Sequence, residues 1–215
     1  MDIKRIRSIC ENYGYVFEQF GGIPRLILVG EQHQSEDHFR VQEELIKDIL
    51  PSVVLHELYS PNFHDSHRLS ETWFGNSSQY KIKRIKELSK EFGFELLPGD
   101  ISIEEGDNLE ERLNEIFLNM GWPDEISRKT HFFSRLIYAK YYSRLIVEPL
   151  MGLRLQNALN KNEGDIMGIF GANHLRPDSQ IHSVLRLKFP PLGEDFVIKN
   201  STLFAQDYIT INQDE

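Results

Sequence analysis

The chain carries one short motif twice, and each copy directly follows an apolar run of the kind that forms a buried strand. The run at 26–29 leads into Gly30-Glu31-Gln32-His33, and a second run at 166–170 leads into Gly171-Ala172-Asn173-His174. Short runs of this kind are typical of strands inside parallel sheets. Because α/β sheets bind ligands beyond the carboxyl ends of their strands, the two Gly-x-x-His motifs predict one shared site.

Two more strands alternate with helical patterns between these motifs. Residues 53–55 and 94–97 have the composition of strands, and apolar side chains at helical spacing indicate helices at 36–49, 80–92 and 179–187. Strands that alternate with helices pair in parallel through right-handed crossovers. The sequence therefore predicts an α/β fold with a mainly parallel central sheet flanked by helices, formed by residues 1–215 as a single domain.

Other segments fall outside this cycle. We expect an opening helix at 2–12 and strands at the sheet edge at 15–17, 196–198 and 208–211. Residues 59–79 follow the second strand at the ligand end of the sheet and are a candidate lid. Residues 107–161 form a helical insertion, interrupted at Pro149, that is larger than a crossover requires. This insertion predicts either a subdomain or a homodimer contact.

The amino-acid composition limits which binding partners and which cellular compartment we expect. The 215 residues are 40% hydrophobic and 27% charged, which is typical of a globular chain, and the formal net charge is -9. That charge opposes a nucleic-acid or anionic-membrane surface, which needs clustered cations. Three features of the sequence favour a cytoplasmic protein. They are the single cysteine, the absence of an apolar leader at residues 1–18 and the absence of a long apolar run.

All four expected strand ends carry ionisable side chains. They are Glu31 and His33, His56 and Glu57, Asp100, and His174. If the order of the strands were 3-2-1-4-5, the first and fourth would be neighbours about 4.8 Å apart, and their two histidines would flank the topological switch point. Strand alternation points His56 and Glu57 to opposite faces, so only one can face the site, and we choose Glu57.

Each of these residues also has a simpler interpretation. Glu31 and Asp100 can cap the helices that follow them. His38 is either a residue that supports the site or a solvated surface residue, and the latter is the expectation for His131 and His182. The pair His64 and His67 has no strand behind it, so a ligand role is the minor alternative.

Imidazole and carboxylate groups together suit Mn, Co, Zn or Fe as a divalent metal. The predicted ligands are His33, Glu57 and His174, with Glu31 as the general base on the metal-activated water. Without metal, the same groups can act as general base and acid. The chain contains neither the Gly-rich phosphate-binding signatures nor a Gly-x-Ser-x-Gly elbow, which argues against NTPase, dinucleotide and α/β-hydrolase functions.

These motifs resemble a known superfamily. Three segments are similar to motifs of the superfamily that joins ChaN-like, erythromycin-esterase-like and TraB/Tiki proteins. They are Val29-Gly30-Glu31-Gln32-His33 with His38, the acidic residue in Leu55-His56-Glu57-Leu58, and Phe170-Gly171-Ala172-Asn173-His174-Leu175. The resemblance extends over roughly residues 25–187. It implies an α/β core with both Gly-x-x-His segments and Glu57 around one site. It also implies a helix arginine, for which we take Arg144.

The resemblance implies two main functions. One is a hydrolase of peptide or ester bonds, acting on a small-molecule or peptide substrate with a divalent metal, in which Glu31, Glu57 and Arg144 are catalytic. The alternative is a non-catalytic protein of the ChaN type that binds haem or iron. A third is a scaffold that retains the fold without turnover.

Overall fold

The computed structural model describes residues 2–13, 15–20, 25–32, 36–59, 76–100, 147–186 and 208–213, with backbone alone at 16–20, 37, 76–79, 186 and 208–213. The strands among these residues form one six-stranded sheet in the order β1-β6-β2-β5-β3-β4. Their bounds are β1 (Tyr15–Phe20), β2 (Leu26–Glu31), β3 (Val53–His56), β4 (Glu95–Pro98), β5 (Ile166–Gly171) and β6 (Tyr208–Gln213).

Five of the six strands run in the same direction. The β4, β3, β5, β2 and β6 strands pair in parallel, and only β1 pairs antiparallel, with β6. The prediction of an α/β fold with a mainly parallel sheet is therefore confirmed, including the shared direction of the strands expected near Leu26, Val53, Glu95 and Met167.

The order of the strands differs from the order considered from the sequence. The β5 strand is a neighbour of β2, as expected, but it lies between β2 and β3, which had been taken as adjacent. Strand order depends on which neighbours bury which faces, so local patterns do not determine it. The actual order places the end of β5 beside both β2 and β3. The strand expected at the sheet edge near residue 208 is also internal, because β1 takes the edge beyond β6.

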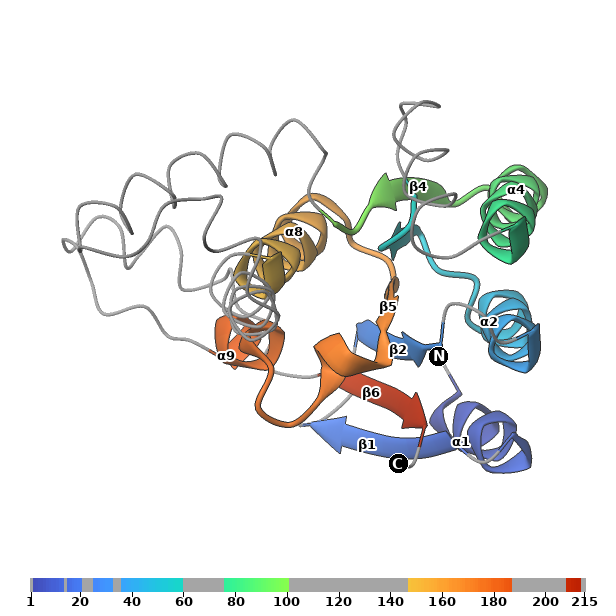
Figure 1. The fold of residues 1–215 in the computed structure, drawn as a ribbon. Coiled ribbons are helices and arrows are strands. Elements are labelled where there is room, and N and C mark those ends of the chain that lie inside the picture. The colour runs from blue at the N-terminus through green and yellow to red at the C-terminus, as the bar shows by residue number, and fades with distance from the viewer. Residues whose placement is uncertain are drawn as a thin grey trace, which may run out of the picture.

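Helices cover both faces of the sheet. Figure 1 shows α1 (Ile3–Asn12), α2 (Glu36–Ile49) and α4 (Asn76–Phe92) on one face, and α8 (Glu148–Lys161) and α9 (Gln180–Arg186) on the other. The side chain of Asp2 caps α1 by accepting from the backbone N–H groups of Lys4 and Arg5. Pro149 lies in the first turn of α8, where its missing N–H leaves no hydrogen bond unmade.

Two buried clusters match these two faces. Residues Ile27, Val29, Val54, Met167 and Ile169 pack with α1, α2 and α4. The residues between them in sequence, including Leu28, Val53, Leu55 and Phe170, pack with α8 and α9. We call these the α2 face and the α8 face. The alternation means that each side chain at a strand end can be assigned to one face.

Some expected segments lie outside the described residues. These are residues 60–75 of the candidate lid, the helical insertion up to residue 146 and the strand at 196–198. Residues 76–79, expected as the end of the lid, form the first turn of α4. Among the helices that the structure describes, none is both long and apolar enough to cross a membrane.

Candidate functional site

The structure brings Glu57 and His174 together on the α8 face. Glu57 directly follows β3, and β5 leads through Gly171 into a 3₁₀ helix (Ala172–Leu175) that carries His174. The Oε1 atom of Glu57 lies 3.6 Å from Nε2 of His174. The other oxygen, Oε2, accepts a hydrogen bond from the backbone N–H of Gly171. The carboxylate is therefore fixed by one oxygen and presents the other to the imidazole.

A second carboxylate, from Glu148, faces the other nitrogen of the same ring. Its Oε1 atom lies 3.4 Å from Nδ1 of His174. Its Oε2 accepts hydrogen bonds from the backbone N–H of Gln180 at 2.8 Å and from the hydroxyl of Ser179 at 3.1 Å. Glu148 thus joins α8, the start of α9 and the imidazole. We refer to Glu57, His174 and Glu148 as the triad.

Sequence reasoning missed Glu148. It is the residue before Pro149, and its one local signal is the acidic side chain at a helix start that the proline marks. That signal predicts a favourable position relative to the helix dipole and says nothing of His174. The contact depends on how α8 packs against the sheet and α9, which no local pattern encodes.

Burial differs among the three members of the triad. The carboxylate side chains of Glu57 and Glu148 are 8% and 5% exposed, whereas the imidazole of His174 is 19% exposed. Burial by itself lowers the pKa of His174, but the hydrogen bonds and charges of Glu148 and Glu57 outweigh it and raise the pKa to about 10. The imidazole is therefore protonated at neutral pH and is the member that solvent reaches most.

Glu31, the predicted general base, lies on the α2 face. Its Oε2 atom accepts a hydrogen bond of 2.6 Å from the side chain of Gln42 on α2. Its charge also acts on the buried Lys81 of α4. Both Glu31 and Gly171 end their strands and are paired in register, but the side chain of Glu31 points to the face opposite Glu57. Its predicted role as the base stays a prediction.

The other described histidines are buried in their own environments. His56 points to the α2 face, opposite Glu57, and its Nδ1 accepts from the backbone N–H of Leu58 at 3.1 Å. His38 accepts from the backbone N–H of Gln32 at 2.8 Å, and Nε2 of His182 lies 3.1 Å from the carbonyl of Leu175. The expectation that His182 is a surface residue is wrong, and so is the solvated alternative for His38, because both side chains are buried.

Two residues of the predicted site, His33 and Arg144, lie outside the described residues, as do His64, His67 and His131. Within the part of the chain that is described, no three His, Cys, Asp or Glu side chains are arranged to hold a metal ion. Asp100, which follows β4, contributes its backbone carbonyl, which accepts a hydrogen bond from the guanidinium of Arg154. The predicted residues that the structure brings together are therefore Glu57 and His174.

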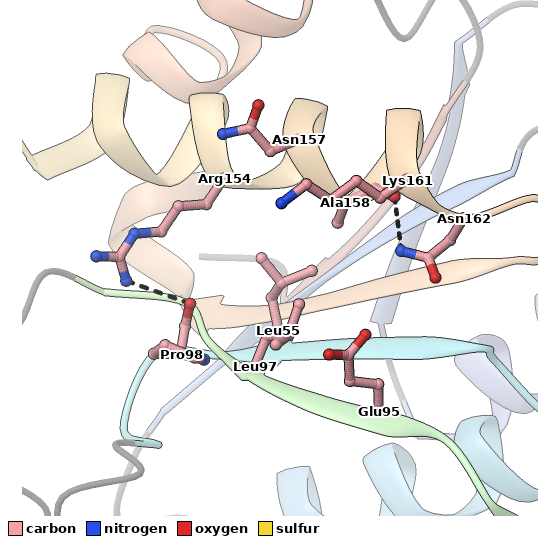
Figure 2. Close-up of a pocket in the computed structure, with 9 residues that line it drawn as sticks. All are labelled: Leu55, Glu95, Leu97, Pro98, Arg154, Asn157, Ala158, Lys161 and Asn162. Carbon is pink, nitrogen blue, oxygen red and sulfur yellow. Dashed lines mark hydrogen bonds between the residues drawn. The ribbon is translucent and has the colours of Figure 1, made fainter.

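A cavity of about 420 Å³ lies between α8 and the β3 and β4 strands (Figure 2), and its lining does not include the three residues of the triad. Leu55, Leu97, Pro98 and Ala158 form its apolar part, and Glu95, Arg154, Asn157, Lys161 and Asn162 add polar groups. Leu55 precedes Glu57 by two residues on the same face of the sheet, and Arg154 lies on the same helix as Glu148. The cavity is large enough for a small organic ligand.

Comparisons with protein-family models, with curated proteins and with solved structures find no match to this chain. The superfamily resemblance is therefore an expectation that depends on the motifs alone.

Proposed function

We propose that the chain is a hydrolase of ester or peptide bonds in which Glu57 and His174 carry out the chemistry and Glu148 orients the imidazole. One observation carries the proposal: each ring nitrogen of His174 faces a buried carboxylate, at 3.6 Å for Glu57 and 3.4 Å for Glu148. Such an arrangement supplies an acid and a base beside each other at the carboxyl ends of parallel strands, where α/β sheets bind their ligands.

The proton transfers follow from this geometry. Glu57 accepts a proton from water as the water oxygen attacks the carbonyl carbon of the substrate. His174, protonated because its pKa is raised to about 10, gives the proton on Nε2 to the leaving oxygen or nitrogen as the scissile bond breaks. The proton on Glu57 then passes to Nε2, which it faces directly. Each cycle consumes one water and restores both groups.

The proposal assigns the base to Glu57 instead of Glu31. Oε1 of Glu57 faces the imidazole, whereas Glu31 is bonded to Gln42 on the other face of the sheet. Glu148 acts through His174, because its Oε1 faces Nδ1 while its Oε2 is engaged by Gln180 and Ser179. A partner on Nδ1 determines which ring nitrogen carries the reactive proton.

A divalent metal is the alternative to these proton transfers, because Nε2 of His174 cannot carry the acidic proton and bind a metal at once. The described residues would supply two of its ligands. Nε2 of His174 and Oε1 of Glu57 lie 3.6 Å apart, and imidazole and carboxylate groups are donors that a divalent metal would accept. A carboxylate on the other ring nitrogen, as supplied by Glu148, is the usual support for a metal-bound histidine. When bound, a metal held by His174, Glu57 and the predicted His33 would supply Lewis-acid activation of water.

The cavity between α8 and the β3 and β4 strands favours a small substrate. Its lining combines apolar and polar side chains, which suits a molecule with an apolar body and one or two polar groups. The alternative of a haem- or iron-binding protein stays a prediction, as do a cytoplasmic location and a homodimer contact.

The function is tested on purified protein with a panel of chromogenic esters and quenched fluorescent peptides. Activity is measured after EDTA treatment and again after addition of Mn²⁺, Co²⁺ or Zn²⁺, alongside an absorption spectrum and elemental analysis. We expect turnover that falls by roughly 10²-fold or more in His174→Ala and Glu57→Gln. Asn173→Ala and Glu163→Gln change exposed side chains and are matched controls that should keep full activity.

The activity measured with and without added metal distinguishes a metal-dependent from a metal-free hydrolase. Activity that returns only with a metal assigns a metal-dependent hydrolase, and activity that survives EDTA assigns the metal-free proton transfers. A Soret band without turnover would instead identify a haem binder, and the hydrolase proposal would then be abandoned.

A further inference from the structure

A hydrogen bond from α9 holds the turn that carries His174, and the proposed chemistry does not use it. Nε2 of His182 lies 3.1 Å from the backbone carbonyl oxygen of Leu175, the residue that follows His174. Because a carbonyl oxygen can only accept, this ring nitrogen carries a hydrogen and donates it. His182 is 4% exposed, so the bond is shielded from water and strengthened by its surroundings.

Apolar packing alone does not fix the orientation of this turn. The side chain of Leu175 is 2% exposed and packs in the buried cluster on the α8 face. Such packing is non-directional, whereas a hydrogen bond constrains the angle of the peptide group that accepts it. A 3₁₀ turn also has poorer internal hydrogen bonds than an α-helix. The bond from His182 therefore orients the backbone one residue beyond His174.

The same helix also holds the carboxylate that faces Nδ1 of His174. The hydroxyl of Ser179, directly before α9, and the backbone N–H of Gln180, its first residue, donate to Oε2 of Glu148 at 3.1 and 2.8 Å. The other oxygen of that carboxylate lies 3.4 Å from Nδ1. The start of α9 therefore holds the carboxylate, and His182, two residues further along, holds the turn that carries the imidazole.

The position of α9 does not depend on His182. The side-chain amide of Gln156 on α8 donates to the backbone carbonyl of Val184 at 2.9 Å. Ile181 and Leu185 of α9 are fully buried in the cluster on the α8 face. Loss of the bond from His182 should therefore release the turn and leave the helix in place.

We propose that His182 is a positioning residue of the hydrolytic site, which orients the 3₁₀ turn so that both nitrogens of the His174 ring face their carboxylates. The inference deepens the function proposed above and rests on it for its kinetic readout. Without the hydrogen bond, the turn can rotate about its anchored apolar side chain and carry the imidazole away from Glu148 and Glu57. Displacements of about 1 Å that originate away from the reacting atoms can reduce catalysis about 10²-fold.

Two substitutions of His182 isolate its contact with Leu175. His182→Leu leaves no donor to reach the carbonyl, whereas the amide that His182→Gln introduces places an N–H donor close to the position of Nε2. Both variants lack Nδ1, so any contact that this atom makes is lost from both. Ser183→Leu introduces the same apolar side chain at an exposed position of α9 and is the matched control.

The test compares these three variants with wild type. The first readout is the pair of ¹H and ¹⁵N chemical shifts of the Nδ1–H group of His174 in EDTA-treated protein at one neutral pH, which depend on the distance of this group from Glu148. His174→Ala identifies the resonance by its loss. The second readout is kcat and KM for the best ester or peptide substrate, with added metal if wild type requires it.

We expect His182→Leu to shift the Nδ1–H resonance of His174 and to lower kcat by about tenfold or more. KM should change by less than about twofold, because the turn does not line the cavity. His182→Gln should restore most of the wild-type shift and keep kcat within about threefold of wild type, and Ser183→Leu should equal wild type. A merely structural role would lower the free energy of unfolding without this split between kcat and KM.

The inference is overturned if His182→Leu and His182→Gln give the same resonance and the same kcat, because the donor to Leu175 would then have no effect. If His182→Leu does not fold, His182→Phe, which keeps a planar ring, takes its place. If that variant also fails to fold, His182→Gln decides alone: a kcat within about threefold of wild type supports the inference, and a larger loss overturns it.

Failure of the proposed function is distinguishable from failure of this inference. If wild type shows no hydrolysis, the proposed function fails by itself. The Nδ1–H resonance of His174 then decides alone whether His182 positions the imidazole.

Discussion

The carboxylate of Glu148 faces Nδ1 of His174 at 3.4 Å, on the side of the imidazole opposite Glu57. One histidine is thus held between two carboxylates, one directly after β3 and one in the first turn of α8. The contact explains how His174 keeps a fixed ring orientation although it lies in a short 3₁₀ turn.

The first prediction concerns the protonation of this ring. Glu148 and Glu57 raise the pKa of His174 to about 10, so in EDTA-treated protein the imidazole should stay protonated well above pH 8. Glu148→Gln and Glu57→Gln should each lower the pKa, because each removes one stabilising charge while retaining size. Imidazole ¹⁵N shifts followed against pH measure this, with Glu163→Gln as the control. A wild-type midpoint near 6.5 would contradict the account.

A second prediction concerns stability against pH. The folded pKa of His174 is raised above the unfolded value of 6.5 by the charges of Glu148 and Glu57, so its stabilisation is complete below about pH 6.5 and is lost as pH rises toward 10. The free energy of unfolding of metal-free wild type should therefore exceed that of His174→Asn by an amount on the order of a few kcal/mol at pH 6, shrinking toward pH 10. Urea titrations at four pH values give this difference, and a constant difference would exclude the linkage.

A third prediction concerns the close approach of Gly99 to the end of β3. A Cβ atom at residue 99 would lie 2.9 Å from the carbonyl carbon of His56 and 3.0 Å from the backbone nitrogen of Glu57. Because both atoms belong to the backbone, Gly99→Ala should push β4 from β3 and lower the free energy of unfolding by about 1–3 kcal/mol. Denaturant unfolding measures the change, with the exposed Asn173→Ala as control. An unaltered free energy of unfolding would contradict this prediction, because it would mean that β4 can move away from β3 without energetic cost.

A fourth prediction concerns the cavity between α8 and the β3 and β4 strands. Leu97→Trp fills the cavity without touching Glu57 or His174, so KM should rise while kcat stays within about twofold of wild type. Leu153→Trp places the same side chain at an exposed position of α8 and is the control. Steady-state kinetics distinguish the two parameters. A lower kcat with unchanged KM would mean that the cavity does not bind the substrate.

Much of the fold and part of the site could be predicted from the sequence. The apolar runs before Gly30 and Gly171 identified two buried parallel strands, because such strands lack polar alternation. Alternation at His56 and Glu57 identified the residue that faces His174, since neighbouring strand residues point to opposite faces. These are properties of single strands, and single strands are what local patterns describe.

The rest depends on contacts between elements. The position of β5 between β2 and β3 follows from how the two cores pack, so spacing along the chain does not reveal it. The two Gly-x-x-His motifs have the same spacing but differ in geometry. In the first motif the strand continues past the glycine, so Glu31 still belongs to β2 and points to the α2 face. In the second motif the glycine, Gly171, is the last residue of β5, and a 3₁₀ turn carries His174. The role of Glu148 follows from the crossing of α8 and α9.

A double-mutant cycle on Glu57 and His174 tests the central claim most directly. kcat/KM is measured for wild type, Glu57→Gln, His174→Ala and the variant that carries both changes. Because the account makes the two groups one proton-transfer unit, the double variant should be no slower than His174→Ala, within about twofold. If the losses multiply, the two residues act independently, and the account of the site would be wrong.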